Sequence, residues 1–212
     1  MKLKIAPSLL AADFSRLPDE IKKVEKESDL LHVDVMDGHF VPNLTLGPMV
    51  VEAIRSLSTL PLDVHLMISE PEKYLEAFAK AGSHILTIHV EAAQEKTPLL
   101  LSRIQALGLK AGLALSPDTP LSAARDYFSK ADMVLLMTVH PGFGGQKFIQ
   151  NVLSKVEELR KNYSGDIEVD GGIDPQTGGE AVRRGANVLV AGTYIFRSDD
   201  SREAIRRLRQ CQ

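Results

Sequence analysis

The stretch His32-Val-Asp-Val-Met-Asp-Gly-His-Phe-Val-Pro-Asn43 joins a short apolar run to a loop that contains glycine and proline. The run from Leu30 to Val35 alternates apolar with polar residues, which predicts a strand. Side chains along a strand have a period of two, so His32, Asp34 and Met36 point to one face. A buried, ionised carboxylate costs several kcal/mol unless it is paired or binds a metal. This stretch therefore predicts either a buried His–Asp hydrogen bond or part of a functional site.

The composition is typical of an ordinary soluble globular protein. The chain has 212 residues, of which 44% are hydrophobic and 25% charged, and its net charge of -3 does not favour nucleic acid or an anionic membrane as a partner. Its longest apolar runs are strand-sized, well short of the ~20 residues that span a bilayer. The single Cys211 has no disulfide partner, and the strand-like Leu3-Lys-Ile-Ala-Pro-Ser8 leaves no room for a signal peptide. We therefore expect a cytoplasmic protein.

Strand-like and helix-like segments alternate along the whole chain. Strict alternation predicts a parallel sheet, because parallel neighbours need a crossover and helices must cover the sheet. Eight such units are the number that closes into a (β/α)8 barrel. The expected strands are Leu3–Ala6, Leu30–Val35, Leu62–Met67, Ile85–Val90, Ala111–Leu115, Met133–Val139, Ile167–Val169 and Val188–Ala191. The expected helices cover about 13–27, 47–57, 69–82, 96–108, a segment opening at 116–120, 147–163, 175–184 and 200–210.

An open, doubly wound sheet is the alternative fold. It would normally place a glycine-rich dinucleotide loop after an early strand, whereas the first turn here, Ser8-Leu-Leu-Ala-Ala-Asp13, has no glycine. We find no linker or low-complexity tract, so we expect one α/β domain, a (β/α)8 TIM barrel over residues 1–212. Gly178-Gly179 lies inside the seventh expected helix, where each glycine costs ~1 kcal/mol against alanine. This pair predicts a short or late-starting helix.

Polar residues fall at the ends of the expected strands, where a barrel has its active site. The third strand carries Asp63, His65 and Met67 on one face, and the seventh ends with Asp170. Two imidazoles and two carboxylates suit Zn2+, Fe2+, Mn2+ or Co2+ better than a thiolate-seeking metal. The alternative is four separate, hydrogen-bonded polar residues. The residues that could meet at the barrel mouth are His32, Asp34, His65 and Asp170.

Glycine clusters follow the last three expected strands and predict a phosphate site. Val139-His-Pro-Gly-Phe-Gly-Gly-Gln146 has three glycines in four positions, and Asp170-Gly-Gly172 and Ala191-Gly-Thr193 follow the next two strands. Glycine lets backbone N–H groups turn toward an anion, and barrels commonly bind phosphate in the loops after strands seven and eight. One such cluster alone is more often a turn, but three at one end of a barrel indicate a barrel of the phosphate-binding type.

Six motifs lie in order over nearly the whole chain: Ala6-Pro-Ser-Leu-Leu10, the stretch 32–43, Asp63-Val-His-Leu-Met67, Pro141-Gly-Phe-Gly-Gly-Gln146, Val169-Asp-Gly-Gly-Ile173 and Val190-Ala-Gly-Thr193. They resemble the motifs of the ribulose-phosphate 3-epimerase family, whose members interconvert D-ribulose 5-phosphate and D-xylulose 5-phosphate in the pentose phosphate pathway. Two positions depart from the family pattern: His140 stands where Asn or Glu is usual, and Thr193, which keeps the hydroxyl group, stands where Ser is usual.

The resemblance implies one divalent metal ion per subunit, with Zn2+ the first choice, bound by the four residues of the predicted cluster. It also implies that Asp34 and Asp170 are the acid/base pair. Met36, Met67 and Met137 either fill core gaps or line the pocket and keep water from the enediolate intermediate. The expected substrate-binding residues are Ser8, His65, Met36, Met67, Met137, Gly142, Phe143, Gly144, Gly145, Asp170, Gly171, Gly172, Gly192 and Thr193.

The expected reaction removes the proton on carbon 3 from one face and returns a proton on the other, through a metal-stabilised enediolate. Aspartates that serve only as metal ligands, with another group as the base, are an alternative. So are a six-carbon ketose phosphate substrate such as D-allulose 6-phosphate, and a non-catalytic sugar-phosphate-binding barrel. A related decarboxylase would carry Asp-x-Lys where this chain has Asp63-Val-His65. We expect a homo-oligomer, although no apolar stretch identifies its interface, and ordinary surface or core roles for His39, His84 and His89.

Overall fold

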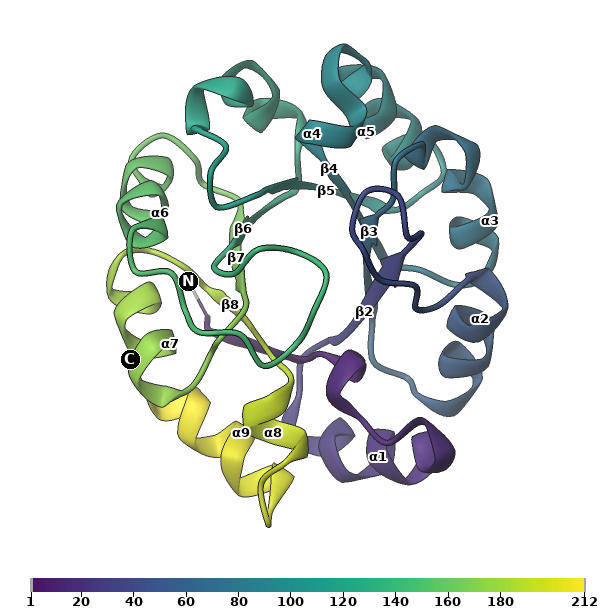
Figure 1. Ribbon diagram of the computed structural model, residues 1–212, viewed down its shortest axis with the longest axis vertical. Coiled ribbons are helices and arrows are strands. Elements are labelled where there is room, and N and C mark those ends of the chain that lie inside the picture. The colour runs from purple at the N-terminus through teal and green to yellow at the C-terminus, as the bar shows by residue number, and fades with distance from the viewer. Residues whose placement is uncertain (1, 212) are drawn as a thin grey trace.

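Eight parallel strands form a ring at the centre of the computed structural model, which describes residues 2–211 (Figure 1). Neighbouring strands follow the order β1-β8-β7-β6-β5-β4-β3-β2. An isolated parallel bridge between Ser8, directly after β1, and His32 of β2 joins the two ends of this order and closes the ring. The expected TIM barrel is therefore confirmed. The strands are β1 (Lys4–Pro7), β2 (Leu31–Met36), β3 (Leu62–Met67), β4 (Ile85–His89), β5 (Lys110–Leu115), β6 (Met133–Met137), β7 (Asp166–Asp170) and β8 (Val188–Ala191).

Helices surround this ring (Figure 1). They are α1 (Leu17–Val24), α2 (Pro48–Leu57), α3 (Leu75–Lys80), α4 (Val90–Ala93), α5 (Thr97–Ala106), α6 (Val152–Arg160), α7 (Pro175–Arg183), α8 (Thr193–Phe196) and α9 (Ser201–Gln210). Within residues 2–211, no helix is both long enough and apolar enough to cross a membrane.

Two expected helices differ from the structure. The segment after β5 forms only 3-10 turns, Leu121–Ala123 and Arg125–Lys130, because Ala124 between them has a φ of -127°, outside the helical range. The sixth helix begins at Val152 rather than at Lys147. The preceding residues stay outside the helix because the Ile149 N–H donates to the Thr138 carbonyl at the end of β6, at 2.8 Å.

The expectation of a short or late helix at the glycine pair was wrong. Helix α7 begins at Pro175 behind a capping box and continues through Gly178 and Gly179, both buried. A Cβ at Gly179 would lie 2.7 Å from the carbonyl oxygen of Cys211, and one at Gly178 would lie 3.0 Å from Leu189 Cδ1. The two glycines therefore let the end of the chain and a side chain of β8 approach the helix closely.

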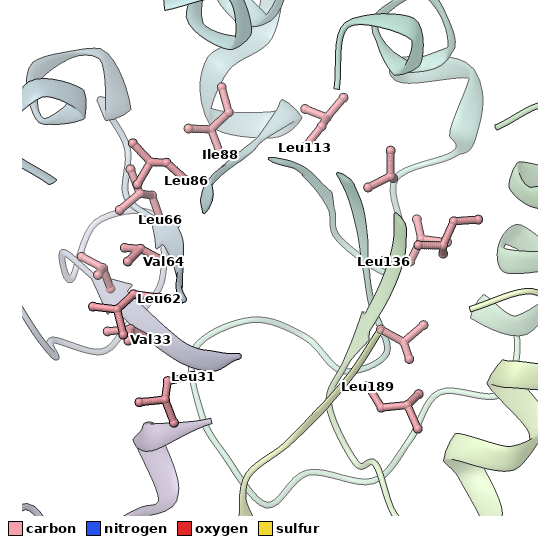
Figure 2. Close-up of a cluster of buried hydrophobic side chains, with 14 of the residues drawn as sticks. Leu31, Val33, Leu62, Val64, Leu66, Leu86, Ile88, Leu113, Leu136 and Leu189 are labelled. Carbon is pink, nitrogen blue, oxygen red and sulfur yellow. The ribbon is translucent and has the colours of Figure 1, made fainter. Parts of the chain in front are cut away.

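The strands divide their side chains between two sides, as the period-two pattern predicts. Figure 2 shows Leu66 of β3, Leu86 of β4 and Leu136 of β6 pointing away from the barrel axis, into the layer between strands and helices. These residues belong to one large cluster of buried hydrophobic side chains. The alternate positions face the barrel interior, and on β2, β3 and β7 they carry ionisable residues.

We predict that Gly112→Ala will lower the free energy of unfolding by about 1–3 kcal/mol, the usual penalty of overpacking. Gly112 of β5 pairs with Thr87 of β4 inside the barrel, and an added Cβ would lie 2.0 Å from Thr87 Oγ1 and 3.1 Å from Thr87 Cα. Urea unfolding measures the change. Gly47→Ala is the control, because no atom lies within 4 Å of its added Cβ. An equal loss in both variants would contradict this account of Gly112.

Candidate metal and substrate site

Two histidines and two aspartates meet at the C-terminal end of the barrel. His32 and Asp34 come from β2, His65 from β3 and Asp170 from the end of β7, and one ligand atom of each lies within 4.8 Å of the others. His32 Nε2 is 3.3 Å from Asp34 Oδ1 and 3.9 Å from Asp170 Oδ2. His65 Nδ1 is 3.4 Å from Asp34 Oδ1. The structure thus brings together the four residues that the sequence predicts, as a set that could hold a metal ion.

The second nitrogen of each histidine has its own partner. His32 Nδ1 lies 2.7 Å from Asp63 Oδ2, and His65 Nε2 lies 2.8 Å from His89 Nε2. The other nitrogens, His32 Nε2 and His65 Nδ1, are buried without a hydrogen-bond partner among the described residues. An unpaired buried polar atom costs ~1–3 kcal/mol, and a metal-bound histidine usually donates its other N–H to a nearby acceptor. The donor set therefore fits a borderline divalent cation.

Below this cluster, Asp63 and Glu168 fill the barrel interior beside His32. All three are fully buried, and Glu168 Oε1 lies 3.7 Å from His32 Nδ1. Burial, and then the charge of Asp63, raise the pKa of Glu168 well above its usual range. Burial alone would lower the pKa of His32, but the carboxylates of Asp34 and Asp63 raise it. The strand patterns did not indicate Glu168, although it shares a face of β7 with Asp170.

The two aspartates of the cluster have opposite electrostatic environments. Burial would raise the pKa of Asp34, but the charge of His32, together with the nearby His65, brings it below its usual value. Burial, and then the charge of Asp34, raise the pKa of Asp170 to about 7. Burial lowers the pKa of His65 to about 4, which leaves a neutral imidazole. A carboxylate beside a carboxyl group that titrates near neutrality suits opposite roles in proton transfer.

A cavity of about 650 Å³ opens above the cluster, which is within the usual range for small-molecule sites. Asp34 and Asp170 line the cavity, whereas His32 and His65 lie beneath it, fully buried. His65 is thus the one expected substrate-binding residue that does not line it. The others that line it are Ser8, Met36, Met67, Met137, Gly142, Phe143, Gly144, Gly145, Gly171, Gly172, Gly192 and Thr193.

One wall of the cavity consists of glycine-rich backbone after β6, β7 and β8. Gly171 and Gly172 have φ values of +118° and +65°, and a Cβ at Gly172 would lie 2.6 Å from the Phe148 nitrogen. Backbone of this kind can turn N–H groups toward an anion. Two cationic residues that the sequence patterns did not indicate, Lys147 and Arg197, also line the cavity. This wall therefore suits a negatively charged part of a ligand.

The loop from Asp37 to Gly47 lies beside the cavity and is organised by its first residue. Asp37 Oδ1 accepts the N–H groups of His39 and Phe40, and Oδ2 accepts that of Ser69, each at 2.8 Å. Burial would raise the pKa of Asp37, but these three hydrogen bonds lower it to about 2. Asp37 therefore stays ionised at neutral pH and fixes the shape of the loop.

This loop also contacts the loop that follows β6, which crosses the barrel mouth (Figure 1). Asn43 Nδ2 donates to the Gly142 carbonyl at 2.7 Å, and a Cβ built on Gly142 would lie 3.4 Å from Val41 Cβ. The two loops therefore support each other beside the expected phosphate wall.

The remaining histidines occupy different places. His39 is exposed, and His84 Nδ1 accepts the Leu62 N–H at the opposite end of the barrel. His140 is exposed and lies 3.7 Å from Asp118. His89 is a buried histidine, as expected, but its contact with His65 was not anticipated. The signal was its position on β4, two residues beyond Thr87, which pairs with His65.

Comparisons with known proteins point to one family. The family model described as "Ribulose-phosphate 3 epimerase family" matches residues 4–196. The chain is 50% identical to ribulose-phosphate 3-epimerase of Bacillus subtilis (strain 168), with 98% of each protein covered. It is 47% identical to the chloroplastic ribulose-5-phosphate-3-epimerase of Arabidopsis thaliana, over 95% of this chain and 74% of the relative.

Solved structures share the fold at lower identity. A crystal structure of 3-hexulose-6-phosphate synthase matches with a TM-score of 0.73 and 21% identity, covering 100% of this chain and 99% of that one. KGPDC from Streptococcus mutans matches with a TM-score of 0.77 and 15% identity, covering 100% and 97%. At these identities the likeness shows the barrel fold alone.

We predict that Asp37→Ala will lower the free energy of unfolding by about 1–2 kcal/mol at neutral pH, because three backbone N–H groups lose their acceptor. Since the pKa of Asp37 is lowered to about 2, its contribution is present above the ordinary Asp pKa and is lost as the pH falls toward 2. Urea unfolding of wild type and variant between pH 2 and pH 7 measures this. The exposed Asp118 supplies the control Asp118→Ala, and a pH-independent difference for Asp37→Ala would refute the prediction.

Proposed function

Because this chain belongs to the ribulose-phosphate 3-epimerase family, we propose that it interconverts D-ribulose 5-phosphate and D-xylulose 5-phosphate by a metal-dependent, two-base reaction at carbon 3. The chain is accordingly an isomerase. The observation that supports the mechanism most strongly is that Asp34 and Asp170, two carboxyl groups with oppositely shifted pKa values, line one cavity directly above two buried histidines.

The proposed metal ligands are His32 Nε2, His65 Nδ1 and one oxygen each of Asp34 and Asp170. The unpaired nitrogens of the two buried histidines support this assignment. Nitrogen and carboxylate ligands favour Zn2+, with Fe2+, Mn2+ and Co2+ as alternatives. When bound, one such ion per subunit supplies positive charge that stabilises the enediolate formed when carbon 3 loses its proton.

Asp34 and Asp170 carry the proposed proton transfers. They come from β2 and β7, strands that are not neighbours in the ring, so a flat enediolate could lie between them. In one direction the Asp34 carboxylate removes the proton from carbon 3, and the Asp170 carboxyl group donates a proton to the opposite face. The reverse direction exchanges their roles, and protons exchanged with solvent restore the starting state. The Ser8 hydroxyl donates to Asp34 Oδ2 at 2.6 Å and fixes the orientation of that carboxylate.

The rest of the cavity would hold the substrate in place. The glycine backbone at Gly171, Gly172 and Gly192, close to Lys147 and Arg197, suits the phosphate group. Met36, Met67 and Met137 line the cavity and are 4%, 1% and 2% exposed, so their apolar side chains reduce the access of water to the enediolate. The cytoplasmic location and the homo-oligomeric state stay predictions.

We predict that Asp34→Asn and Asp170→Asn will each lower kcat by roughly two to four orders of magnitude, the usual contribution of a general acid or base. The fold should survive, because Asn has nearly the shape of Asp. Activity on D-ribulose 5-phosphate and unfolding by urea measure both effects. Asp118→Asn, an exposed aspartate that does not line the cavity, should retain full activity. Near-full activity in either site variant would remove the two-base mechanism.

We also predict that His65→Ala will lose most of its bound metal, because one of the four proposed ligands is gone. Elemental analysis of the purified protein gives the metal content per chain. The exposed His39 supplies the control His39→Ala, which should retain the wild-type content. An unchanged metal content in His65→Ala would exclude His65 from the ligand set.

A further inference from the structure

Three side chains lead away from the metal cluster along β3 and β4. His65 Nε2 lies 2.8 Å from His89 Nε2, and His89 Nδ1 lies 3.0 Å from Glu91 Oε2. The two imidazole rings are fully buried and stacked, with centroids 5.0 Å apart and planes at 25°. Phe40 covers His89 from another side, at a centroid distance of 4.8 Å. Neither His89 nor Glu91 has a part in the mechanism described above.

Glu91 sets the direction of the hydrogen bonds between these three side chains, because its carboxylate can only accept hydrogen bonds. Its Oε1 accepts the Ser116 N–H at 2.7 Å and the Thr119 hydroxyl, while Oε2 faces His89. Burial alone would raise the pKa of Glu91, but the hydrogen bonds from His89, Thr119 and Ser116 lower it to about 2. The side chain is therefore an ionised carboxylate, and His89 Nδ1 must carry the proton between them.

The donor and acceptor roles of the His89 and His65 nitrogens follow from the same hydrogen bonds. A cation on His65 Nδ1 requires the His65 proton on Nε2, so Nε2 donates and His89 Nε2 accepts. The His89 proton then lies on the nitrogen that faces Glu91 Oε2, and the His65 lone pair lies on Nδ1. That nitrogen is the one that faces Asp34 Oδ1, at 3.4 Å. The acceptor at Glu91 thus supports the tautomer of His65 that can bind a cation through Nδ1.

We propose that His89 and Glu91 are positioning residues, which hold His65 in the tautomer and ring orientation required for metal binding. The inference rests on the metal site of the proposed function. It also explains why the two histidines of the cluster have different partners. His32 presents Nε2 to the cluster, and its Nδ1–H donates directly to the Asp63 carboxylate. His65 presents Nδ1 instead, and the imidazole of His89 lies between its Nε2 and the Glu91 carboxylate, so that His89 acts as a relay.

Glu91→Gln reverses the relay with almost no change of shape. The Ser116 N–H can only donate, so the amide oxygen of the new side chain must stay at the position of Oε1. Its NH2 group then faces His89 Nδ1, which must accept, and the His89 proton moves to Nε2. His65 Nε2 has to accept in turn, and the His65 proton moves to Nδ1, where it blocks the metal.

The test compares Glu91→Gln with Thr119→Val, which removes one hydrogen bond to Glu91 but leaves the direction of the chain intact. Zn2+ affinity is measured by competition with a chromophoric chelator, and the imidazole tautomers of metal-free protein by 15N NMR. We expect Glu91→Gln to bind Zn2+ about 10- to 100-fold more weakly, the usual effect of such outer partners. Thr119→Val should bind like wild type, and wild-type His65 should carry its proton on Nε2.

Equal Zn2+ affinities in wild type and Glu91→Gln would overturn the relay, and so would an equal loss in both variants, which would indicate a merely structural role. A wild-type His65 with its proton on Nδ1 would also overturn it, without any variant that has to fold. If wild-type protein bound no Zn2+, Fe2+, Mn2+ or Co2+ but showed the expected tautomers, the metal site of the proposed function would fail and the hydrogen-bond direction would stand.

Discussion

The burial of ionisable groups inside the barrel is the constraint on which this structure depends. Barrel interiors are usually filled by bulky apolar side chains, whereas this one buries His32, Asp63, His65, His89 and Glu168 at 0% exposure. Each such group must find a hydrogen bond, lose its charge or bind a cation. Two imidazole nitrogens that face the carboxyl groups of Asp34 and Asp170 have no hydrogen-bond partner among the described residues. A divalent cation at that point would satisfy both nitrogens and offset the charge of the nearby carboxylates.

The alternation of side chains along each strand explains how much of the fold and of the site the sequence could predict. On β2 and β3 every second residue faces the helices and is apolar, and the residues between them are ionisable. Period-two patterns therefore located both the strands and the four residues of the His–Asp cluster. Strand positions were confirmed to within about two residues. The motif of β2 added the family, because its order of His, Asp, Met and Gly is specific, whereas the glycine loops alone were not.

What the sequence could not predict depends on contacts between distant segments. His89 meets His65 through the register of β3 and β4, and strand patterns alone do not give register. Gly179 is required by the approach of Cys211, which is far along the chain. After β5, the conformation of Ala124 divides the expected helix into 3-10 turns. In each case the local pattern was compatible with two outcomes, and tertiary packing selected one.

The exchange of hydrogen at carbon 3 of D-ribulose 5-phosphate in D2O, followed by NMR, tests the central claim most directly. Metal-replete protein should introduce deuterium at carbon 3 while D-xylulose 5-phosphate appears. Both should stop when a chelator removes the metal and resume when Zn2+ is restored. Absence of exchange in metal-replete protein would contradict the account of Asp34 and Asp170 as the two bases acting on this substrate.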